Sequence, residues 1–311
     1  MNTSGHLHQA SEEWVKTIDE EKGYSSIDAR TFRTLIGRMS GYAFFRAVLR
    51  HVQPSPFDEA RLLAVRRPRG PLRLEWAAAS WMMLSFRGGL RVKRGGLFAL
   101  STAEVPPRAS QSVLEAGCGW ALTSFALAGR GICATALDIS EKLVRDLQKL
   151  KVRLGEPYVS NLTAVVGDIF RLSELNAKFD AVVSDGTYEH FLAEEDRCTI
   201  LRSIRAVLRE NGVFVVAVPN LHNPLFGSVV DPKMPAMHPF SLKELVAELE
   251  CGGFWVTETG FSFVNPGFAQ WVQARWMIAA VRAAGVIFRF LPRPLKRIFG
   301  AHLYCVARMT P

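Results

Sequence analysis

The stretch Val113-Leu114-Glu115-Ala116-Gly117-Cys118-Gly119-Trp120-Ala121 decides the fold of this chain. Its apolar start is typical of a buried strand, and the two glycines after it allow a tight turn and a close backbone approach to a ligand. A helix that begins after the turn would present free N–H groups to that ligand. Dinucleotide-binding turns and purely structural turns share this pattern, so the loop alone does not identify the ligand.

From residue 112 onward, short apolar runs alternate with helical patterns. This alternation predicts an α/β fold with a parallel, doubly wound sheet, whose ligands bind at the carboxyl ends of the strands. Asn211-Gly212 is expected to turn the chain into the fifth strand, and Ser241 with Glu244 is expected to form a capping box. The predicted strands are 112–115, 134–138, 163–166, 179–184, 213–218, 255–264 and 303–308, and the predicted helices are 121–128, 141–153, 195–209 and 241–250.

Acidic residues end the first three of these strands. Glu115 precedes the first glycine by two residues, where a carboxylate suits the ammonium group of a sulfonium amino acid better than it suits a pyrophosphate. Asp138 could accept hydrogen bonds from both hydroxyls of a ribose, and Asp168 could accept one from the exocyclic amine of adenine. Either aspartate could instead cap the helix that follows it. Acids at three consecutive strand ends nevertheless favour a nucleoside cofactor.

Four motifs, in this order and spacing, make the chain resemble the class I S-adenosylmethionine-dependent methyltransferases of the small-molecule type. The motifs are 113–119, Leu137-Asp138-Ile139-Ser140, Gly167-Asp168-Ile169 and Phe179-Asp180-Ala181-Val182-Val183-Ser184-Asp185-Gly186. The similarity spans residues 110–264 and the last strand, and its one visible departure is Ala121 at the third small position of the glycine loop. The resemblance implies a Rossmann-like sheet of seven strands, methyltransferase activity and S-adenosyl-L-methionine as the cofactor. The residues that it implies for cofactor binding are Glu115, Gly117, Gly119, Asp138, Ile139, Asp168, Ile169 and Ser184.

Two other functions are compatible with such a loop. A nicotinamide-dependent oxidoreductase could use the same turn, but the acids of the first and third strands would have no role in binding a pyrophosphate. A catalytically silent scaffold could keep the fold and bind the cofactor without transferring a methyl group. The intact glycines and acids argue against this second alternative.

The methyl acceptor is poorly encoded, because a sulfonium is already an excellent leaving group and the enzyme mainly supplies alignment. Residues 185–191 lack the Asn/Asp-Pro-Pro-aromatic tetrapeptide of methyltransferases that act on adenine, which argues against a nucleic-acid substrate. His190 and His238 follow the fourth and fifth strands, so either imidazole could act as a general base or have a structural role. His222 and Tyr188 are further candidates for substrate contact. We expect a small, apolar or lipid-like metabolite that is methylated on O, N or C.

Composition adds limits of its own. The chain has 311 residues, of which 49% are hydrophobic and 22% charged, a balance typical of globular proteins. No nucleic-acid recognition motif accompanies the net charge of +9. The five cysteines lack metal-ligand spacing, so no metal site is expected. Residues 1–24 contain no apolar run typical of a signal peptide, which predicts a cytoplasmic protein.

Two segments are added to the predicted sheet. We expect residues 1–110 to form a helical cap on the substrate side, and residues 111–311 to form the methyltransferase domain with a helical insertion at 265–300. Arg275, Arg282 and Arg289 recur at sevenfold spacing in this insertion, among apolar residues. It could be a lid packed on the amino-terminal helices, a lid that meets an anionic substrate, or a helix at 268–298 that lies on a membrane surface. The oligomeric state is not encoded.

Overall fold

The computed structural model describes residues 29, 32–33, 36, 39, 43–52, 111–220, 222–223, 237–238, 240–262, 287–288 and 290–310. Contacts divide the chain into two units, of which the first joins residues 1–53 to 110–311 and the second is 54–109. The whole second unit lies outside the described residues, and so do most of the predicted cap and Arg275, Arg282 and Arg289 of the predicted insertion. Within the described parts of the chain, no helix is both long and apolar enough to cross a membrane.

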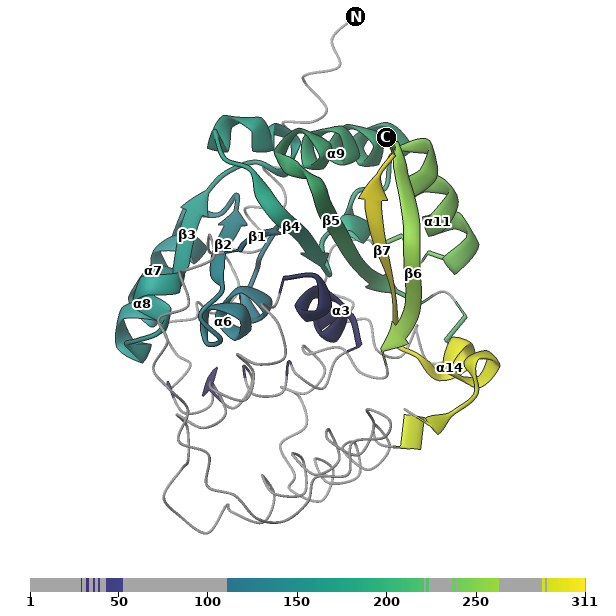
Figure 1. Cartoon of the computed structure of the whole chain (residues 1–311), viewed down its shortest axis with the longest axis horizontal. Coiled ribbons are helices and arrows are strands. Elements are labelled where there is room, and N and C mark those ends of the chain that lie inside the picture. The colour runs from purple at the N-terminus through teal and green to yellow at the C-terminus, as the bar shows by residue number, and fades with distance from the viewer. Residues whose placement is uncertain are drawn as a thin grey trace, which may run out of the picture. The chain divides into compact units, whose positions relative to one another are not determined.

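A seven-stranded sheet forms the core of the protein, with the strand order β3-β2-β1-β4-β5-β7-β6 (Figure 1). The first five strands pair in parallel, and β7 lies antiparallel between β5 and β6. This arrangement confirms the predicted α/β, Rossmann-like sheet. The strands are β1 Ser112–Ala116, β2 Cys133–Asp138, β3 Leu162–Val166, β4 Phe179–Asp185, β5 Leu208–Pro219, β6 Phe254–Ser262 and β7 His302–Met309.

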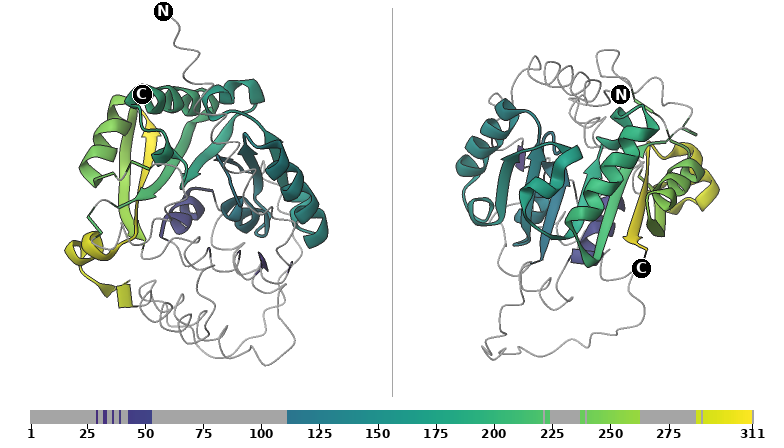
Figure 2. Two further views of the ribbon diagram at one scale, coloured as in Figure 1. Left: turned by 180° about the vertical axis from the view of Figure 1, so that it is seen from behind. Right: turned by 90° about the horizontal axis from the view of Figure 1, so that it is seen from above.

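Helices cover both faces of the sheet (Figure 2). Because successive side chains of a strand point to opposite faces, each strand contributes to two apolar clusters. One cluster packs the sheet against α3, α6, α7 and α8, and the other packs it against α9, α11 and η3. These elements are α3 Ala43–Val52, α6 Leu122–Ala128, α7 Glu141–Leu154, α8 Tyr158–Asn161, η3 Ile169–Leu175, η4 Tyr188–His190, α9 Glu194–Val207, α11 Leu242–Cys251 and α14 Arg293–Phe299.

Apolar side chains of the amino-terminal segment are part of this core. In α3, the side chains of Phe44, Phe45 and Val48 are buried, and the helix packs on β4, β5, β6 and β7. Phe32 lies edge-on to Phe125 of α6, with ring centroids 4.9 Å apart. The aromatic residues of this segment therefore complete one face of the sheet.

The predicted helix and strand boundaries agree with the structure to within a few residues, with one larger difference. The expected turn at Asn211-Gly212 is part of β5, which begins at Leu208 directly after α9. The pairing of β4 with β5 shifts its register here: Phe179 pairs with Leu208, but Ala181, two residues later, pairs with Val213. The residues of β5 between these two pairs include the Asn211-Gly212 dipeptide. The predicted capping box is confirmed, because Ser241 and Glu244 accept each other's backbone N–H groups at the start of α11.

A buried ion pair joins α9 to α11. Arg197 donates from Nε to both carboxylate oxygens of Glu248, at 2.9 and 3.0 Å, and the two side chains are only 6% and 8% exposed. Nη1 of Arg197 donates to the carbonyls of Phe191 and Leu192, and the hydroxyl of Tyr188 donates to Glu248. Tyr188, a candidate for substrate contact from the sequence, thus directs its hydroxyl at this pair, and the segment after β4 is fixed to two helices.

This network predicts an unequal response to single and double substitution. Arg197→Met should lower the free energy of unfolding by about 3 to 5 kcal/mol, because it leaves the carboxylate of Glu248 buried without its cation. Arg197→Met combined with Glu248→Gln should cost less than the single change, because the unpaired charge is then removed. Urea denaturation measures both effects. Arg202→Met, which removes an exposed arginine of the same helix, serves as the control. An equal loss in Arg202→Met would contradict the assignment.

Candidate functional site

The glycine loop lies between β1 and α6, at the carboxyl end of the sheet. Gly117 and Gly119 both adopt positive φ angles, of +69° and +46°, which side chains of other residues rarely adopt. A Cβ atom on Gly117 would lie 2.3 Å from Cγ2 of Thr187, whereas one on Gly119 would meet nothing within 4 Å. Gly117 is therefore required by packing within the protein, and Gly119 faces open space in which a ligand backbone contact is feasible.

Ala121, the departure noted in the sequence, ends the loop with a left-handed backbone. Its φ is +50° and its side chain is buried against the helices of one sheet face. An L-residue in this region costs about 1 to 2 kcal/mol relative to the right-handed conformation. The loop therefore keeps the backbone path that a third glycine would allow, and fills the adjacent space with a methyl group.

Glu115 is buried at the end of β1 and points toward the start of α6. Its Oε2 accepts a hydrogen bond from the backbone N of Ser124 at 2.7 Å. Burial raises the pKa of the Glu115 carboxyl to about 7, although the hydrogen bonds from Ser124 and Thr123 oppose that rise. A carboxyl in this state ionises readily when a cation is placed beside it.

Asp138 connects the end of β2 to the glycine loop. Its Oδ2 accepts from the backbone N of Gly119 at 3.0 Å, and its Oδ1 accepts from the backbone N of Ser140 at 3.1 Å. The side chain is buried, and Ile139 beside it is half-buried. A carboxylate oxygen can accept more than one hydrogen bond, which makes this side chain chemically suited to ribose hydroxyls.

Asp168 caps the helix that follows it, which was one of the two roles that the sequence allowed for this residue. Its Oδ1 accepts from the backbone N of Phe170 at 2.9 Å and thereby caps η3. Oδ2 has no such backbone contact in the described structure, and Ile169 beyond it is buried. Ser184, near the end of β4, is fully buried, and its Oγ has no hydrogen-bond partner within the described residues.

The two histidines proposed as bases lie on adjoining segments. His190 is half-buried at the end of η4, and the backbone N of His238 donates to the carbonyl of Glu189 in the same element at 2.8 Å. The imidazole of His238 is 2.6 Å from Oε1 of Glu244 through its Nε2. His222, by contrast, is exposed and contacts Arg297 of α14 at 3.1 Å. The predicted role of His190 and His238 as general bases stays a prediction.

Two further acids at this edge were not selected from the sequence. Asp185 is the last residue of β4, and Glu189 follows it in η4 with its side chain 2% exposed. Burial raises the pKa of each carboxyl to about 8, with a smaller contribution from a neighbouring acid in both cases. The sequence did contain a signal for Asp185. It directly follows the predicted strand 179–184, and Asp138, which was selected, stands at the end of the predicted strand 134–138. Within the described residues, no group of three or more His, Cys, Asp or Glu could hold a metal ion.

Comparison with known proteins agrees with this geometry. A family model described as a methyltransferase domain matches residues 113–212. An uncharacterized methyltransferase of Mycobacterium tuberculosis is 33% identical over 123 residues, which is 39% of this chain and 58% of that relative. The 2-heptyl-1-hydroxyquinolin-4(1H)-one methyltransferase of Mycobacteroides abscessus is 29% identical over 136 residues, or 44% of this chain and 57% of that relative. The chain therefore spans less than two thirds of the length of these curated relatives.

Solved structures of methyltransferases were also matched, at low identity. A glycopeptide N-methyltransferase in complex with S-adenosyl-L-methionine is 18% identical and covers 66% of this chain and 89% of its own, with a TM-score of 0.46. The CcbJ methyltransferase of Streptomyces caelestis is 15% identical and covers 65% of this chain and 85% of its own, also with a TM-score of 0.46. Residues 113–212 match the methyltransferase-domain model, and the sheet that contains them has the α/β strand order described above.

Proposed function

We propose that this protein transfers the methyl group of S-adenosyl-L-methionine to an O, N or C atom of a small, apolar or lipid-like metabolite. The observation that carries the proposal is the arrangement around the glycine loop, where Glu115, Asp138 and Asp168 end three adjacent parallel strands. The loop lies beside the boundary between β1 and β4, at which the strand order reverses. Open α/β sheets bind their ligands at such a switch point.

Each acid has a role in holding the cofactor. In the proposed complex, Asp138 accepts the ribose hydroxyls, and Asp168 accepts the exocyclic amine of adenine with the oxygen that does not cap η3. Glu115 supplies negative charge near the cationic methionine part, and Gly119 lets the loop approach the ligand closely. Ile139 and Ile169 contribute apolar contact to the adenine, and Ser184 contributes a hydroxyl without a partner in the described structure.

In the proposed reaction, the main task of the protein is to align the acceptor atom with the methyl group of the cofactor. The acceptor atom attacks the methyl carbon in line with the sulfonium, and the breaking C–S bond leaves its electron pair on sulfur. A protonated acceptor must in addition lose a proton, for which His190 or His238 is the proposed base. His238 is held by Glu244, whose pKa is lowered because the hydrogen bonds from His238 and Ser241 outweigh the effect of burial.

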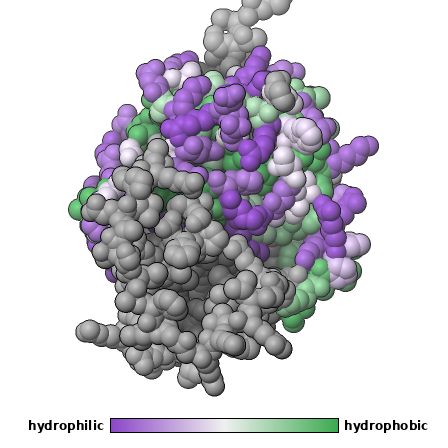
Figure 3. All heavy atoms as spheres, in the orientation of Figure 1, coloured by the Kyte–Doolittle hydropathy of each residue, from purple (hydrophilic) through white to green (hydrophobic). Residues whose placement is uncertain are grey.

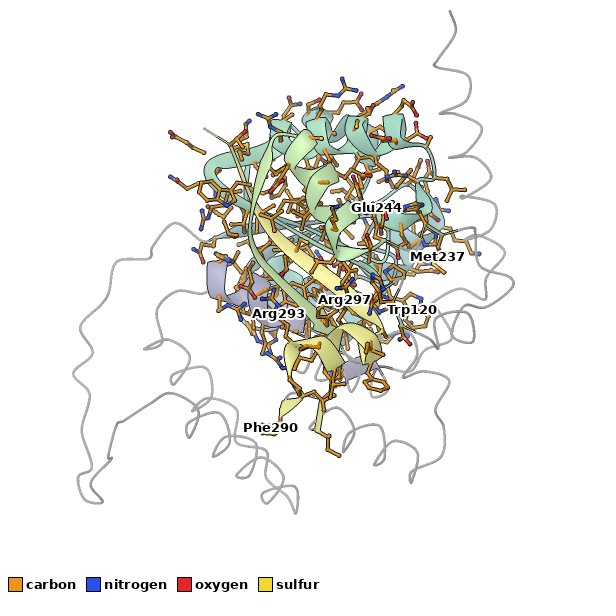
Figure 4. All side chains as sticks on the ribbon, turned by 90° about the vertical axis from the view of Figure 1, so that its right-hand side faces the viewer. Trp120, Met237, Glu244, Phe290, Arg293 and Arg297 are labelled. Atoms are coloured by element: carbon orange, nitrogen blue, oxygen red, sulfur yellow. The ribbon has the colours of Figure 1, made fainter. Side chains whose placement is uncertain are left out.

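A basic, apolar surface around α14 supports the lipid-like acceptor and a cytoplasmic, membrane-peripheral location. Figure 3 shows apolar residues next to hydrophilic ones at the lower right, where Figure 1 places α14. Phe290 is 63% exposed and projects away from the sheet in Figure 4, in which Arg293 and Arg297 are also labelled. The side chain of Asn220, at the end of β5, donates to the carbonyls of Arg297 and Gly300, so this surface is attached to the ligand edge of the sheet. Further exposed apolar residues here are Ile287, Leu295, Ile298 and Phe299.

The cofactor assignment predicts that Asp138→Ala weakens S-adenosyl-L-methionine binding by about 1 to 3 kcal/mol, because the ribose hydroxyls lose their acceptor. Isothermal titration calorimetry measures the change. Asp180→Ala is a matched control, since Asp180 also accepts from a backbone amide, that of Ser112, but at the opposite end of the sheet. Unchanged affinity in Asp138→Ala, or tighter binding of a nicotinamide cofactor to the wild type, would overturn the assignment.

The two glycines of the loop should respond differently to alanine. Gly117→Ala should lower the melting temperature strongly, because its Cβ would overlap Thr187 and the backbone φ is positive. Gly119→Ala should cost only about 1 kcal/mol of stability through its φ angle, yet weaken cofactor binding. Thermal unfolding and calorimetry on both variants separate the effects. Equal loss of stability in the two variants would show that the space beside Gly119 has no special role.

The α14 surface predicts binding to anionic membranes. The wild type should float with vesicles of phosphatidylcholine and phosphatidylglycerol but not with phosphatidylcholine alone, because basic residues attract the anionic headgroups. Phe290→Ser with Ile298→Ser should reduce flotation. Trp255→Ser is the control, since this residue is 64% exposed at the other end of β6. Flotation that is unchanged in the double variant, or equally reduced in the control, would rule out this surface as the contact.

A further inference from the structure

Asp185 and Glu115 point to the same side of the sheet from neighbouring strands. Glu115 pairs with Val183 in the parallel ladder between β1 and β4, so Asp185 lies two residues further along β4 and on the same face. Burial raises the pKa of the Asp185 carboxyl, and the charge on Glu115 adds to that rise. Asp185 therefore lies at the carboxyl end of β4, on the same face as Glu115 and beside the switch point between β1 and β4.

Glu189 brings a second carboxyl to Asp185. Gly186 turns the chain with a φ of +75°, and Oγ1 of Thr187 then donates to the carbonyl of Gly117 at 2.7 Å. This contact fixes η4 against the cofactor loop. Oε1 of Glu189 lies 3.8 Å from the position that a Cβ atom on Gly186 would occupy, so the Glu189 carboxyl turns back toward the residue directly after Asp185.

The Glu189 carboxyl is buried and incompletely satisfied. Its side chain is 2% exposed, and Oε2 has no hydrogen-bond partner within the described residues. In the same part of the chain, neither Asp185 nor Glu189 forms an ion pair, whereas the similarly buried Glu248 has Arg197. A buried carboxyl without a partner is costly, so a site of this kind fits a ligand that supplies the missing donor or cation.

The charged side chains on the elements around Asp185 and Glu189 either bind other residues or are themselves acidic. On β1 the neighbour is Glu115, which accepts from Ser124. On the segment before α11, His238 contacts Glu244, and on α9 Arg197 is bound to Glu248. His190 lies next to Glu189 in η4 itself. Among the described residues, no lysine or arginine forms an ion pair with Asp185 or Glu189.

We propose that Asp185 and Glu189 form the subsite that receives the nitrogen of an amine acceptor, an inference that rests on the function proposed above. An ammonium donates up to three hydrogen bonds and carries the charge that a pair of carboxylates lacks. An alcohol or a carbon nucleophile brings no positive charge, so it gives these two buried acids no reason to release their protons. The acceptor is therefore an otherwise apolar amine, consistent with the apolar surface around α14.

The transfer step balances with these groups alone. The ammonium first gives one proton to the Glu189 carboxylate and becomes a neutral amine. Its lone pair forms the N–C bond to the methyl group while the C–S bond breaks, and the electron pair remains on sulfur as S-adenosylhomocysteine forms. The product is a methylammonium ion. Glu189 is thus a binding residue that also takes the proton, and Asp185 keeps the nitrogen in place.

The test uses two probes of equal chain length, octylamine and 1-octanol, titrated into the full-length protein loaded with S-adenosylhomocysteine. Wild type should bind the amine more tightly than the alcohol by about tenfold or more, as expected for hydrogen bonds to a charged group. Glu189→Gln should remove this preference and leave S-adenosylhomocysteine binding unchanged. Asp185→Asn is the second variant, and Glu210→Gln, which neutralises an exposed acid, is the matched control.

Proton release provides an independent readout. Because burial raises the pKa of both acids to about 8, they hold protons in the free protein, and an arriving ammonium should displace them. Calorimetry in phosphate and in Tris buffer should show this release for wild type and less of it for Glu189→Gln. A purely structural role of Glu189 would not produce it.

Other outcomes overturn the inference in distinct ways. Equal affinity of wild type for octylamine and 1-octanol would show that the two acids do not select an amine. If Glu189→Gln and Asp185→Asn weaken S-adenosylhomocysteine instead of the amine, the acids serve the ammonium of the cofactor. If the wild type binds neither S-adenosyl-L-methionine nor S-adenosylhomocysteine, the proposed function itself fails, which the cofactor titration shows separately.

Discussion

The close packing of Thr187 on Gly117 is the contact on which the site depends. It joins the loop after β1 to the segment after β4 with a hydrogen bond of 2.7 Å and leaves no room for a Cβ atom. The same segment is held from behind by the ion pair of Arg197 with Glu248. In the proposed methyl transfer, these contacts would hold the loop after β1 and the segment after β4 at the fixed separation that an in-line displacement requires.

Most of the fold was predictable because its signals are local. Strands read as short apolar runs, α11 begins at a capping box, and the acids at the ends of β1, β2 and β3 mark the ligand edge. The start of β5 was predicted too late because the Asn211-Gly212 pair is typical of a turn, whereas pairing of Leu208 with Phe179 extends the strand. At this position, pairing with the neighbouring strand β4 determines the structure rather than the turn propensity of Asn-Gly.

The site was less predictable than the fold, since roles depend on contacts between distant residues. The sequence could not show that Tyr188 is directed at Glu248, 60 residues away, or that His238 contacts Glu244. It also could not show that Glu189 is buried without a full set of partners. Asp168 illustrates the converse, because a capping acid and a cofactor acid have the same local pattern and the structure shows the cap.

The strand order has a consequence for how the chain is made. β6 has a single neighbour in the sheet, β7, and the segment 263–301 separates the two in the chain. On the ribosome, β6 is therefore synthesised before its partner, and its place in the finished sheet depends on β7, which lies between it and β5. During this interval β5 and β6 both have open edges, and open edges invite pairing with other chains. A nascent chain stalled within 263–301 would therefore present two open strand edges that the finished sheet closes with β7.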